Sequence, residues 1–520
     1  MAYPVAYGLW PVACGLFCGI VPPHMHTAAR LFVAFLLTVG AIAPAASRAR
    51  EDVATPVATV PDPEARCHPA CETGPGQGPG VAGDPLARDV LKELVEINTT
   101  DSVGSTTKAA EAMAARLKAA GFPDSDLRVL GPDPRKGNFV ARLRGSGARK
   151  PILLLAHLDV VEARRDDWSF DPFTFLERDG YYYGRGVTDM KDMAAAWIAN
   201  LIRYRRELFR PSRDIIVALT ADEEGGAFNG VDYLLKNHRD LIEAEYCLNE
   251  GGGGQIHDGR YTVMNIQAAE KVYLSFALVS KNPGGHSSLP VKDNAIYHLA
   301  GALSRLARFD FPVKLNDVTR AHFDRMSRVE KGQLAADLKA ASARTPDPAA
   351  VSRLSRIAYY NALMRTTCVA TELEGGHAEN ALPQTARAVV NCRLLPDESP
   401  SRVQQALLRI VADTKVSVTP IGEPDLGPPS PLNPEVMRGV ESVTSAMWPG
   451  VPVVPVMATG ATDGRTLRRA GIPTYGLGAF ESIGDVRAHG KDERIGIRQF
   501  NEEVEFLYRV VKTLASPGGQ

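Results

Sequence analysis

Five short segments of this chain carry histidine and carboxylate side chains that could bind metal ions. Imidazoles and carboxylates are ligands that divalent ions accept in proteins, and two ions about 3.5–4 Å apart can polarise a carbonyl and activate a water molecule. The set therefore predicts hydrolysis of an amide bond through a metal-activated water. In chain order the residues are His157 and Asp159 in AHLDVV, Asp189 in GRGVTDMKD, Glu223 and Glu224 in TADEEGG, Glu250 in LNEGGGG, and His489 in AHGKDE.

Taken singly, each of these residues has an ordinary structural explanation. His157 suits a hydrogen-bonded core histidine, Asp189 a helix cap, and His489 a surface turn. Their common order and spacing favours the metal site. Within it, Asp159 is expected to accept a hydrogen bond from the second ring nitrogen of His157 and so to fix its tautomer.

The elements that must position these residues are strands and helices in alternation. Residues 152–156 and 215–219 are continuous apolar runs, which suit strands buried in a parallel sheet. Residues 193–204 predict a crossover helix between them. Such a pattern predicts an α/β fold, a mostly parallel sheet sandwiched by helices, whose sites form at the carboxyl ends of the strands.

The pattern changes near Glu270. Residues 272–279 alternate like a half-exposed strand, and the loop NPGGHSS follows. Helical stretches, two more strands and a helix then predict an inserted α+β domain of a normal size. The expected domains are residues 85–269 (first half of the catalytic domain), 270–425 (inserted dimerisation or lid domain) and 426–520 (second half of the catalytic domain).

The first 84 residues are expected to lie outside the folded domains. Residues 1–49 resemble a targeting segment whose true start is Met25, because residues 31–43 form a short apolar run before the small-residue sequence APA. Residues 50–84 are rich in Pro and Gly and predict a disordered linker. The protein is therefore expected in the periplasm or secreted. An uncleaved membrane anchor is the alternative, which Pro and Gly residues in the segment disfavour.

Composition limits the class of protein. With 45% apolar and 23% charged residues, the 520-residue chain is typical of a soluble protein with two domains. A net charge of −1 argues against a nucleic-acid partner. Seven cysteines are present. Cys67 and Cys71 could form a local disulfide or a zinc clip. Cys247, Cys368 and Cys392 are interpreted as small buried hydrophobic residues.

The ordered motifs resemble the co-catalytic zinc metallopeptidase family of glutamate carboxypeptidase, acetylornithine deacetylase, succinyl-diaminopimelate desuccinylase, aminoacylase and carnosinase. The similarity covers about residues 86–515. It implies two divalent ions, zinc first and cobalt or manganese as alternatives, a cis peptide after Asp189, and Glu223 as general base. It also implies the ligands: His157, Asp189 and Glu250 for one ion, and Asp189, Glu224 and His489 for the other, with Asp189 bridging.

The same resemblance implies roles for the inserted domain. His286 in GGHSS would reach the substrate, often across a homodimer interface, to stabilise the oxyanion. Asn380 and Arg393 would bind the substrate, with the guanidinium gripping a carboxylate. Glu rather than Asp at position 250 favours carboxypeptidase or aminoacylase activity. Asp192 departs from the family, because many members have Gly there.

The expected function is cleavage of amide bonds in small peptides or N-acyl amino acids that carry a free carboxylate, by a carboxypeptidase or a deacylase. The alternative is a non-catalytic small-molecule binding protein on the same fold. A serine hydrolase is disfavoured, because the chain lacks a Gly-x-Ser-x-Gly sequence. Nucleotide binding is disfavoured because the glycine run after Glu250 has no following Gly-Lys-Ser/Thr.

Overall fold

The computed structural model describes residues 80–517. The expected targeting segment, almost all of the expected linker, and the Cys67/Cys71 pair lie outside the described residues. Within residues 80–517, no helix combines the length and the apolar composition that a membrane crossing needs.

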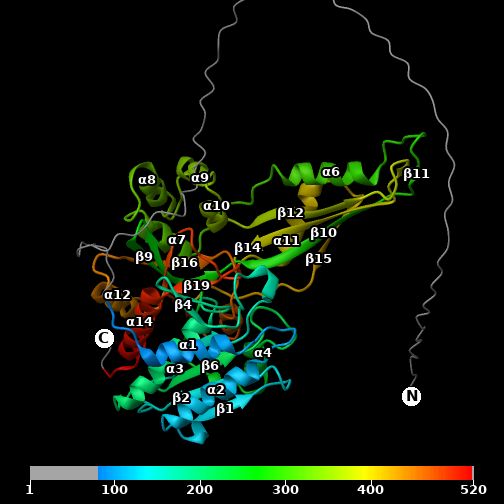
Figure 1. Ribbon diagram of the computed structural model, residues 1–520. Coiled ribbons are helices and arrows are strands. Elements are labelled where there is room, and N and C mark those ends of the chain that lie inside the picture. The colour runs from blue at the N-terminus through cyan, green and yellow to red at the C-terminus, as the bar shows by residue number, and fades with distance from the viewer. Residues whose placement is uncertain (1–79, 518–520) are drawn as a thin grey trace, which may run out of the picture. The chain divides into compact units, whose positions relative to one another are not determined.

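A ten-stranded sheet forms the largest layer, with the order β1-β2-β6-β3-β7-β17-β9-β8-β18 and with β16 paired to β9 (Figure 1). Its strands come from both ends of the described chain. They are β1 (Leu127–Leu130), β2 (Asn138–Leu143), β3 (Ile152–His157), β6 (Ile215–Thr220), β7 (Tyr246–Asn249), β8 (Gly253–His257), β9 (Arg260–Glu270), β16 (Val453–Ala458), β17 (Thr474–Gly476) and β18 (Phe480–Ser482).

The central strands confirm the predicted buried parallel sheet. Every residue of β3 and β6 is buried, as expected for strands covered on both faces. β3 pairs in parallel with β6 on one side and with β7 on the other. The carboxyl ends of these three strands therefore meet at one edge of the sheet.

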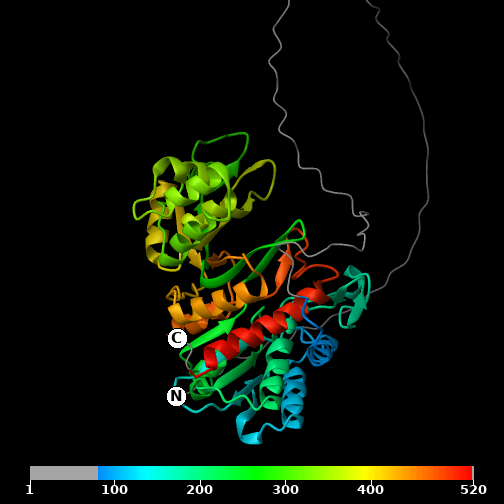
Figure 2. The ribbon, with the colours of Figure 1, turned by 90° about the vertical axis from the view of Figure 1, so that its left-hand side faces the viewer.

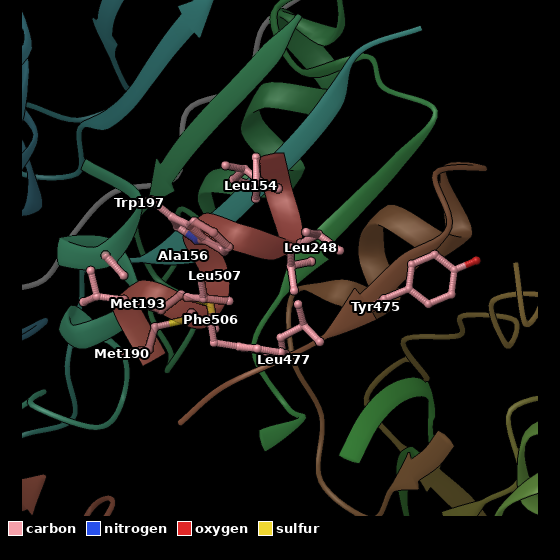
Figure 3. Packing of buried hydrophobic residues seen from close by; sticks show 14 of the residues in the cluster. Leu154, Ala156, Met190, Met193, Trp197, Leu248, Tyr475, Leu477, Phe506 and Leu507 are labelled. Carbon is pink, nitrogen blue, oxygen red and sulfur yellow. The ribbon is translucent and has the colours of Figure 1, made fainter. Parts of the chain in front are cut away.

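Helices cover one face of the sheet with large apolar side chains (Figure 3). In Figure 3, Trp197 of α3 and Phe506 and Leu507 of α14 lie beside Leu154 of β3 and Leu248 of β7. The helices on this side are α1 (Pro85–Glu96), α2 (Thr106–Ala119), α3 (Lys191–Arg206) and α14 (Ile497–Ala515), and α12 (Pro434–Met447) runs alongside α14 (Figure 2).

Shorter helices cover the opposite face. Side chains of α4 (Gly230–Asn237), α5 (Arg239–Ile242) and α13 (Gly464–Arg469) pack in one cluster with Leu153, Leu155 and other residues of β2, β3 and β6. Helices thus sandwich the sheet, and the predicted α/β fold class is confirmed.

A second sheet has four antiparallel strands in the order β12-β14-β10-β15. Its strands are β10 (Val272–Lys281), β12 (Thr367–Gly375), β14 (Thr385–Leu394) and β15 (Val416–Ile421). Apolar residues of β10 and β14 pack under α6 (Ala295–Leu306) and α11 (Pro400–Val411). Two small sheets complete the described strands: β11 (Gly285–His286) with β13 (Ala381–Leu382), and β4 (Leu176–Arg178) and β19 (Arg494–Gly496) with β5 (Tyr181–Tyr183).

Four helices within residues 270–425 pack away from the four-stranded sheet. Val318, Phe323 and Leu338 belong to the same apolar cluster as Met457 of β16 in the large sheet. The expected boundaries placed these helices in the inserted domain, whereas their apolar side chains belong to the cluster that packs on the large sheet. They are α7 (Asp317–Met326), α8 (Gly332–Ala341), α9 (Pro348–Leu354) and α10 (Ala358–Met364).

Two of the cysteines interpreted as buried hydrophobic residues form a disulfide. Cys368 of β12 and Cys392 of β14 lie directly opposite each other in the strand register and are bonded. The sequence interpretation was wrong for this pair, because the strand register that makes them neighbours is set by the fold and not by their spacing. Cys247 remains a free, buried thiol, as interpreted.

Candidate metal centre

Three parallel strands deliver ligand-type side chains to one edge of the large sheet. His157 is the last residue of β3, Glu223 and Glu224 follow β6, and Glu250 follows β7. Because these strands are neighbours, their carboxyl ends bring side chains that are distant in sequence close together.

Loops add the two remaining ligand candidates. Asp189 lies just before α3, and the Asp189–Met190 peptide is cis, as the family resemblance predicted. His489 lies in the loop before β19, where its carbonyl oxygen accepts a hydrogen bond of 3.4 Å from Arg185. Arg185 also pairs with Glu493 over 2.6 Å.

The buried carboxylate of Glu493 organises the loop that carries Asp189. It accepts hydrogen bonds from the backbone N–H groups of Gly186 and Thr188, at 3.1 and 3.0 Å, and from the hydroxyl of Thr188 at 3.0 Å. Glu493 thereby connects the Asp189 loop to the His489 loop. Glu493 ends the motif AHGKDE but was not among the residues expected at the site.

The carboxylate of Asp189 lies between the two imidazoles. Its Oδ1 is 3.1 Å from Nε2 of His157, and its Oδ2 is 3.0 Å from Nε2 of His489. Oε1 of Glu250 is 3.8 Å from His157 Nε2, and Oε1 of Glu224 is 2.8 Å from His489 Nε2. The five side chains that the resemblance implied as ligands are therefore gathered at one place, with Asp189 in the middle.

The tautomer of His157 is fixed differently from the expectation. Its Nδ1 donates to the backbone carbonyl of Asp159 over 3.0 Å, whereas Oδ1 of the Asp159 carboxylate is 3.7 Å away. Oδ2 of that carboxylate accepts from the backbone N–H of Glu224 over 3.0 Å and so holds the loop of the glutamate pair. The result for His157 is the same, since Nε2 is left free to bind a cation.

The centre holds more carboxylates than imidazoles, and this excess shifts their pKa values. Burial raises the pKa of Glu223 to about 8, with His157 opposing the shift and the carboxylates of Asp463 and Glu224 adding to it. Burial, with the charges of Glu223 and Asp189, also raises the pKa of Glu250 well above its ordinary value, against the opposing effect of His157.

The contacts between Asp189 and the two imidazoles shift the pKa values of Asp189 and His489 in the directions that favour their charged forms. Burial would raise the pKa of Asp189, but hydrogen bonds from His157 and His489 hold it below its ordinary value. The hydrogen bond to Asp189 raises the pKa of His489 to about 9, although burial opposes the shift. Close carboxylates that repel one another indicate a place where positive charge would be stabilised.

The donor set fits divalent metal ions. Two groups of three side chains each place their ligand atoms within 4.8 Å of one another: His157, Glu223 and Glu250 in one, and His157, Asp189 and Glu224 in the other. Nitrogen and oxygen donors at such distances suit zinc and similar ions. Glu223, which the resemblance implied as a base, lies close enough to be in contact with a cation or its water.

Asp463 is a buried carboxylate of this edge that sequence reasoning missed. It directly precedes α13; its Oδ1 accepts a hydrogen bond of 2.7 Å from the side-chain amide of Asn229, and its Oδ2 lies 3.4 Å from the hydroxyl of Thr220. Burial raises its pKa to about 6. Its segment, ATGATDGR, falls within residues 426–520, the expected second half of the catalytic domain. Nothing in that segment alone reveals that the fold places it beside β6.

The three residues of the inserted domain that were expected to contact the substrate, His286, Asn380 and Arg393, are not gathered at one place. Arg393 lies near the end of β14, where its Nη1 is 3.5 Å from the carbonyl oxygen of Thr459 in the loop that leads to Asp463. His286 and Asn380 lie at the other end of the sheet, where β11 pairs with β13 (Figure 1). The N–H of Ser287 donates to Asn380 over 3.0 Å.

His286 is far from the metal-binding edge within one chain. The ten residues of β10, fully extended, separate the two ends of the four-stranded sheet by about 30 Å. The ring of His286 is exposed, and its Nδ1 lies 2.7 Å from the hydroxyl of Ser288. The structure therefore brings the ligand candidates together and leaves His286 and Asn380 apart from them.

Comparisons with known proteins identify the family of this chain. The model of the family described as Peptidase family M20/M25/M40 matches residues 153–513. The human N-fatty-acyl-amino acid synthase/hydrolase PM20D1 is 27% identical over 376 residues, covering 70% of this chain and 74% of that protein.

Solved structures of the same family share the fold. The M20 family metallo-carboxypeptidase Sso-CP2 of Sulfolobus solfataricus aligns with a TM-score of 0.60 at 18% identity, over 82% of this chain and 99% of that one. The Bacillus subtilis YXEP protein, described as a dinuclear metal binding peptidase, aligns with a TM-score of 0.53 at 12% identity, over 82% and 97%.

Proposed function

Because this chain belongs to peptidase family M20/M25/M40, and is a metal-dependent hydrolase of amide bonds in peptides or N-acyl amino acids, we propose a specific division of labour in its active centre. His157, Asp189 and Glu250 would hold one divalent ion, and Asp189, Glu224 and His489 the other. Zinc is the first candidate for both. The observation that carries this proposal is the Asp189 carboxylate, whose two oxygens each lie within 3.1 Å of a different imidazole.

When bound, two such ions would polarise the scissile carbonyl and make a water molecule more acidic. The protein groups do the rest. Glu223 takes the proton of the attacking water and passes it to the nitrogen of the leaving amine. Its ligand atom lies within 4.8 Å of those of His157 and Glu250, which supports this role.

Substrate orientation is assigned to Arg393. A guanidinium can grip a carboxylate with two parallel hydrogen bonds, and Arg393 has its aromatic neighbour Tyr273 at 4.8 Å and no carboxylate partner among the described residues. Its contact with the Thr459 loop supports a position close to the metal-binding edge. The preferred substrate would then carry a free carboxylate next to the scissile amide.

The other side of the scissile bond is proposed to be apolar. The loops that carry the ligand candidates expose apolar side chains: Phe228 follows the glutamate pair, and Ile483 and Val486 precede His489. Apolar side chains on loops beside a site favour an apolar binding partner. This supports an N-acyl amino acid with an apolar acyl group, as in the name of the human relative, over a peptide with a charged amino-terminal residue.

A homodimer would bring His286 of one subunit to the metal-binding edge of the other. The edge strand β12 has an unpaired side in the described chain and exposes Val369 and Leu373. Exposed apolar edge strands tend to pair with another chain. A partner copy bound along this edge could supply its own His286 to the active centre, where it would stabilise the developing oxyanion.

The periplasm or the exterior of the cell is the proposed location. The disulfide between Cys368 and Cys392 supports an oxidising compartment, and the segment that would direct export lies outside the described residues. Fractionation of cells that produce the full chain would test this, with cytoplasmic recovery as the contrary result.

A substrate panel tests the proposed chemistry. We expect hydrolysis of N-acyl amino acids with apolar acyl groups, slower hydrolysis of charged dipeptides, and much slower hydrolysis when the carboxylate is replaced by a primary amide. Equal rates for free acids and amides would contradict the role of Arg393. A complete lack of amide hydrolysis by the metal-loaded protein would favour the non-catalytic binding protein.

A further inference from the structure

Polar side chains lie on one face of the four-stranded sheet near the start of β10, where the buried Lys271 directly precedes that strand. Nζ of Lys271 donates to the hydroxyl of Thr367 on β12 over 3.2 Å, which places Lys271 beside Thr367. Tyr273 is paired with Arg393 of β14, which is in turn paired with Thr367 of β12. Lys271, Tyr273, Arg393 and Thr367 therefore share this face, opposite to the face covered by α6 and α11.

Lys271 is buried without a compensating carboxylate. Only 1% of its surface is exposed. Its Nζ donates to the carbonyl oxygens of Ala362 and Arg365, at 2.9 and 2.8 Å, and to the hydroxyl of Thr367 at 3.2 Å. Among the described residues, no Asp or Glu lies within ion-pair distance of this ammonium group. Burying an unpaired charge is costly, so such an arrangement requires an explanation.

The carboxylate next to Lys271 in the sequence is turned to the other side of the strand. Glu270 pairs with Arg468 and accepts from the backbone N–H of Thr462 over 2.6 Å. The side chain of Arg365 is likewise directed elsewhere, toward Asp310 at 3.4 Å and Ser355 at 2.9 Å. Glu270 therefore does not neutralise Lys271.

Arg393 is the charged group that faces Lys271. In the described chain it also lacks an acidic partner, since its contacts are the Tyr273 ring at 4.8 Å and the Thr459 carbonyl at 3.5 Å. Two cations on one face, neither neutralised by an acidic residue of the described chain, form a local excess of positive charge. A bound anion would remove that excess.

We propose that Lys271 is the second cation of the substrate-carboxylate subsite, lying behind Arg393 and increasing the preference for substrates with a free carboxylate over neutral analogues. This inference rests on the proposed function and deepens it. Arg393 contacts the carboxylate, and Lys271 acts through its charge and through the position it gives to β12 and to Arg393. It is therefore a positioning and specificity-determining residue.

The ionisation of Lys271 makes the inference testable in the unmodified protein. Burial and then the charge of Arg393 lower the pKa of Lys271 to about 7. Above that pH the free protein loses the charge of Lys271, and the attraction for a carboxylate weakens. A bound carboxylate stabilises the ammonium form and raises the pKa of Lys271. The Michaelis constant for an anionic substrate should therefore increase with pH above about 7, and that for its neutral amide should not.

The experiment compares an N-acyl amino acid with its primary amide, using kcat/KM measured at pH 6.5 and at pH 9 on the metal-loaded protein. We expect the ratio of acid to amide in the wild type to decrease roughly tenfold across this range, as for one charge lost at close range in an environment of intermediate polarity. Lys271→Met should have the low ratio at both pH values, and Lys271→Arg the high ratio at both. The amide reports any general damage that a substitution causes.

Lys281→Met is the matched control, because Lys281 is an exposed lysine on the same face at the far end of β10. It should retain the wild-type ratio and its pH dependence. A wild-type ratio that does not change with pH, or a Lys271→Met ratio equal to that of the wild type, would overturn the inference while leaving the proposed function intact. A wild type that hydrolyses neither substrate would overturn the proposed function itself.

Discussion

Nε2 of His489 lies 2.8 Å from Oε1 of Glu224, although 265 residues separate them in the chain. Glu224 is placed by the end of β6, and His489 by a loop that Arg185 and Glu493 hold against the Asp189 segment. The contact therefore exists only when both halves of the large sheet are assembled. Glu224 and His489 are two of the three residues proposed to hold the second metal ion.

The two adjacent glutamates should respond differently to the same substitution. Glu223→Gln should decrease kcat by several orders of magnitude while the bound metal stays near the wild-type amount, because a general base is removed and no assigned ligand is lost. Glu224→Gln should instead lose metal. Parallel measurements of kcat and of metal content distinguish the two. Retained turnover in Glu223→Gln would show that the base is another group.

His286 should matter for turnover and should act from a partner subunit. His286→Ala is expected to decrease kcat by about a hundredfold to a thousandfold, as for loss of an oxyanion donor, with metal content unchanged. Co-expression of His286→Ala with Glu223→Gln should recover activity, because one site of each mixed dimer would have both groups intact. Mixtures that remain as inactive as the separate variants would place His286 outside the active centre or within its own subunit.

Much of the metal-binding edge could be predicted because its residues lie next to local signals. Apolar runs identify β3 and β6; the ligand candidate His157 is the last residue of β3, and Glu224 follows β6 within a few positions. The glutamate pair is recognisable for the same reason. In an α/β sheet the carboxyl ends of strands are where a site forms, so sequence adjacency to a strand end already limits the position in space.

The remaining features depend on which distant segments become neighbours. Cys368 and Cys392 are bonded because β12 and β14 pair in one register, which the spacing of the two cysteines does not determine. Helix α7 packs on the large sheet through contacts such as that of the His322 ring with the carbonyl oxygen of Pro455 in β16, which periodicity cannot assign to one partner or another. The position of Asp463 likewise depends on a loop that meets β6 across more than two hundred residues of sequence.

Acidification should destabilise the packing of α7 on the large sheet. Burial, opposed by a hydrogen bond to the carbonyl of Pro455, lowers the pKa of His322 from 6.5 to about 4. Between those pH values the unfolded chain binds a proton that the folded chain does not, so stability decreases as the pH falls from about 7 toward 4. At pH 5 this group should cost roughly 2 kcal/mol of unfolding free energy.

Denaturant unfolding of wild type and His322→Gln at pH 7 and pH 5 measures this effect. The variant should lose less stability on acidification than the wild type does. His257→Gln serves as the control, because the side chain of His257 is 63% exposed, and its loss of stability should match that of the wild type. An identical pH response in all three proteins would contradict the assignment of this loss of stability to His322.

The metal content of the purified protein, measured together with its amide hydrolysis, tests the central claim most directly. The account predicts about two divalent ions per chain at full loading, loss of activity on exhaustive chelation, and recovery when zinc, cobalt or manganese is returned. Elemental analysis of each sample alongside the rate of amino-acid release provides both quantities. Full activity in a sample free of metal would contradict the account.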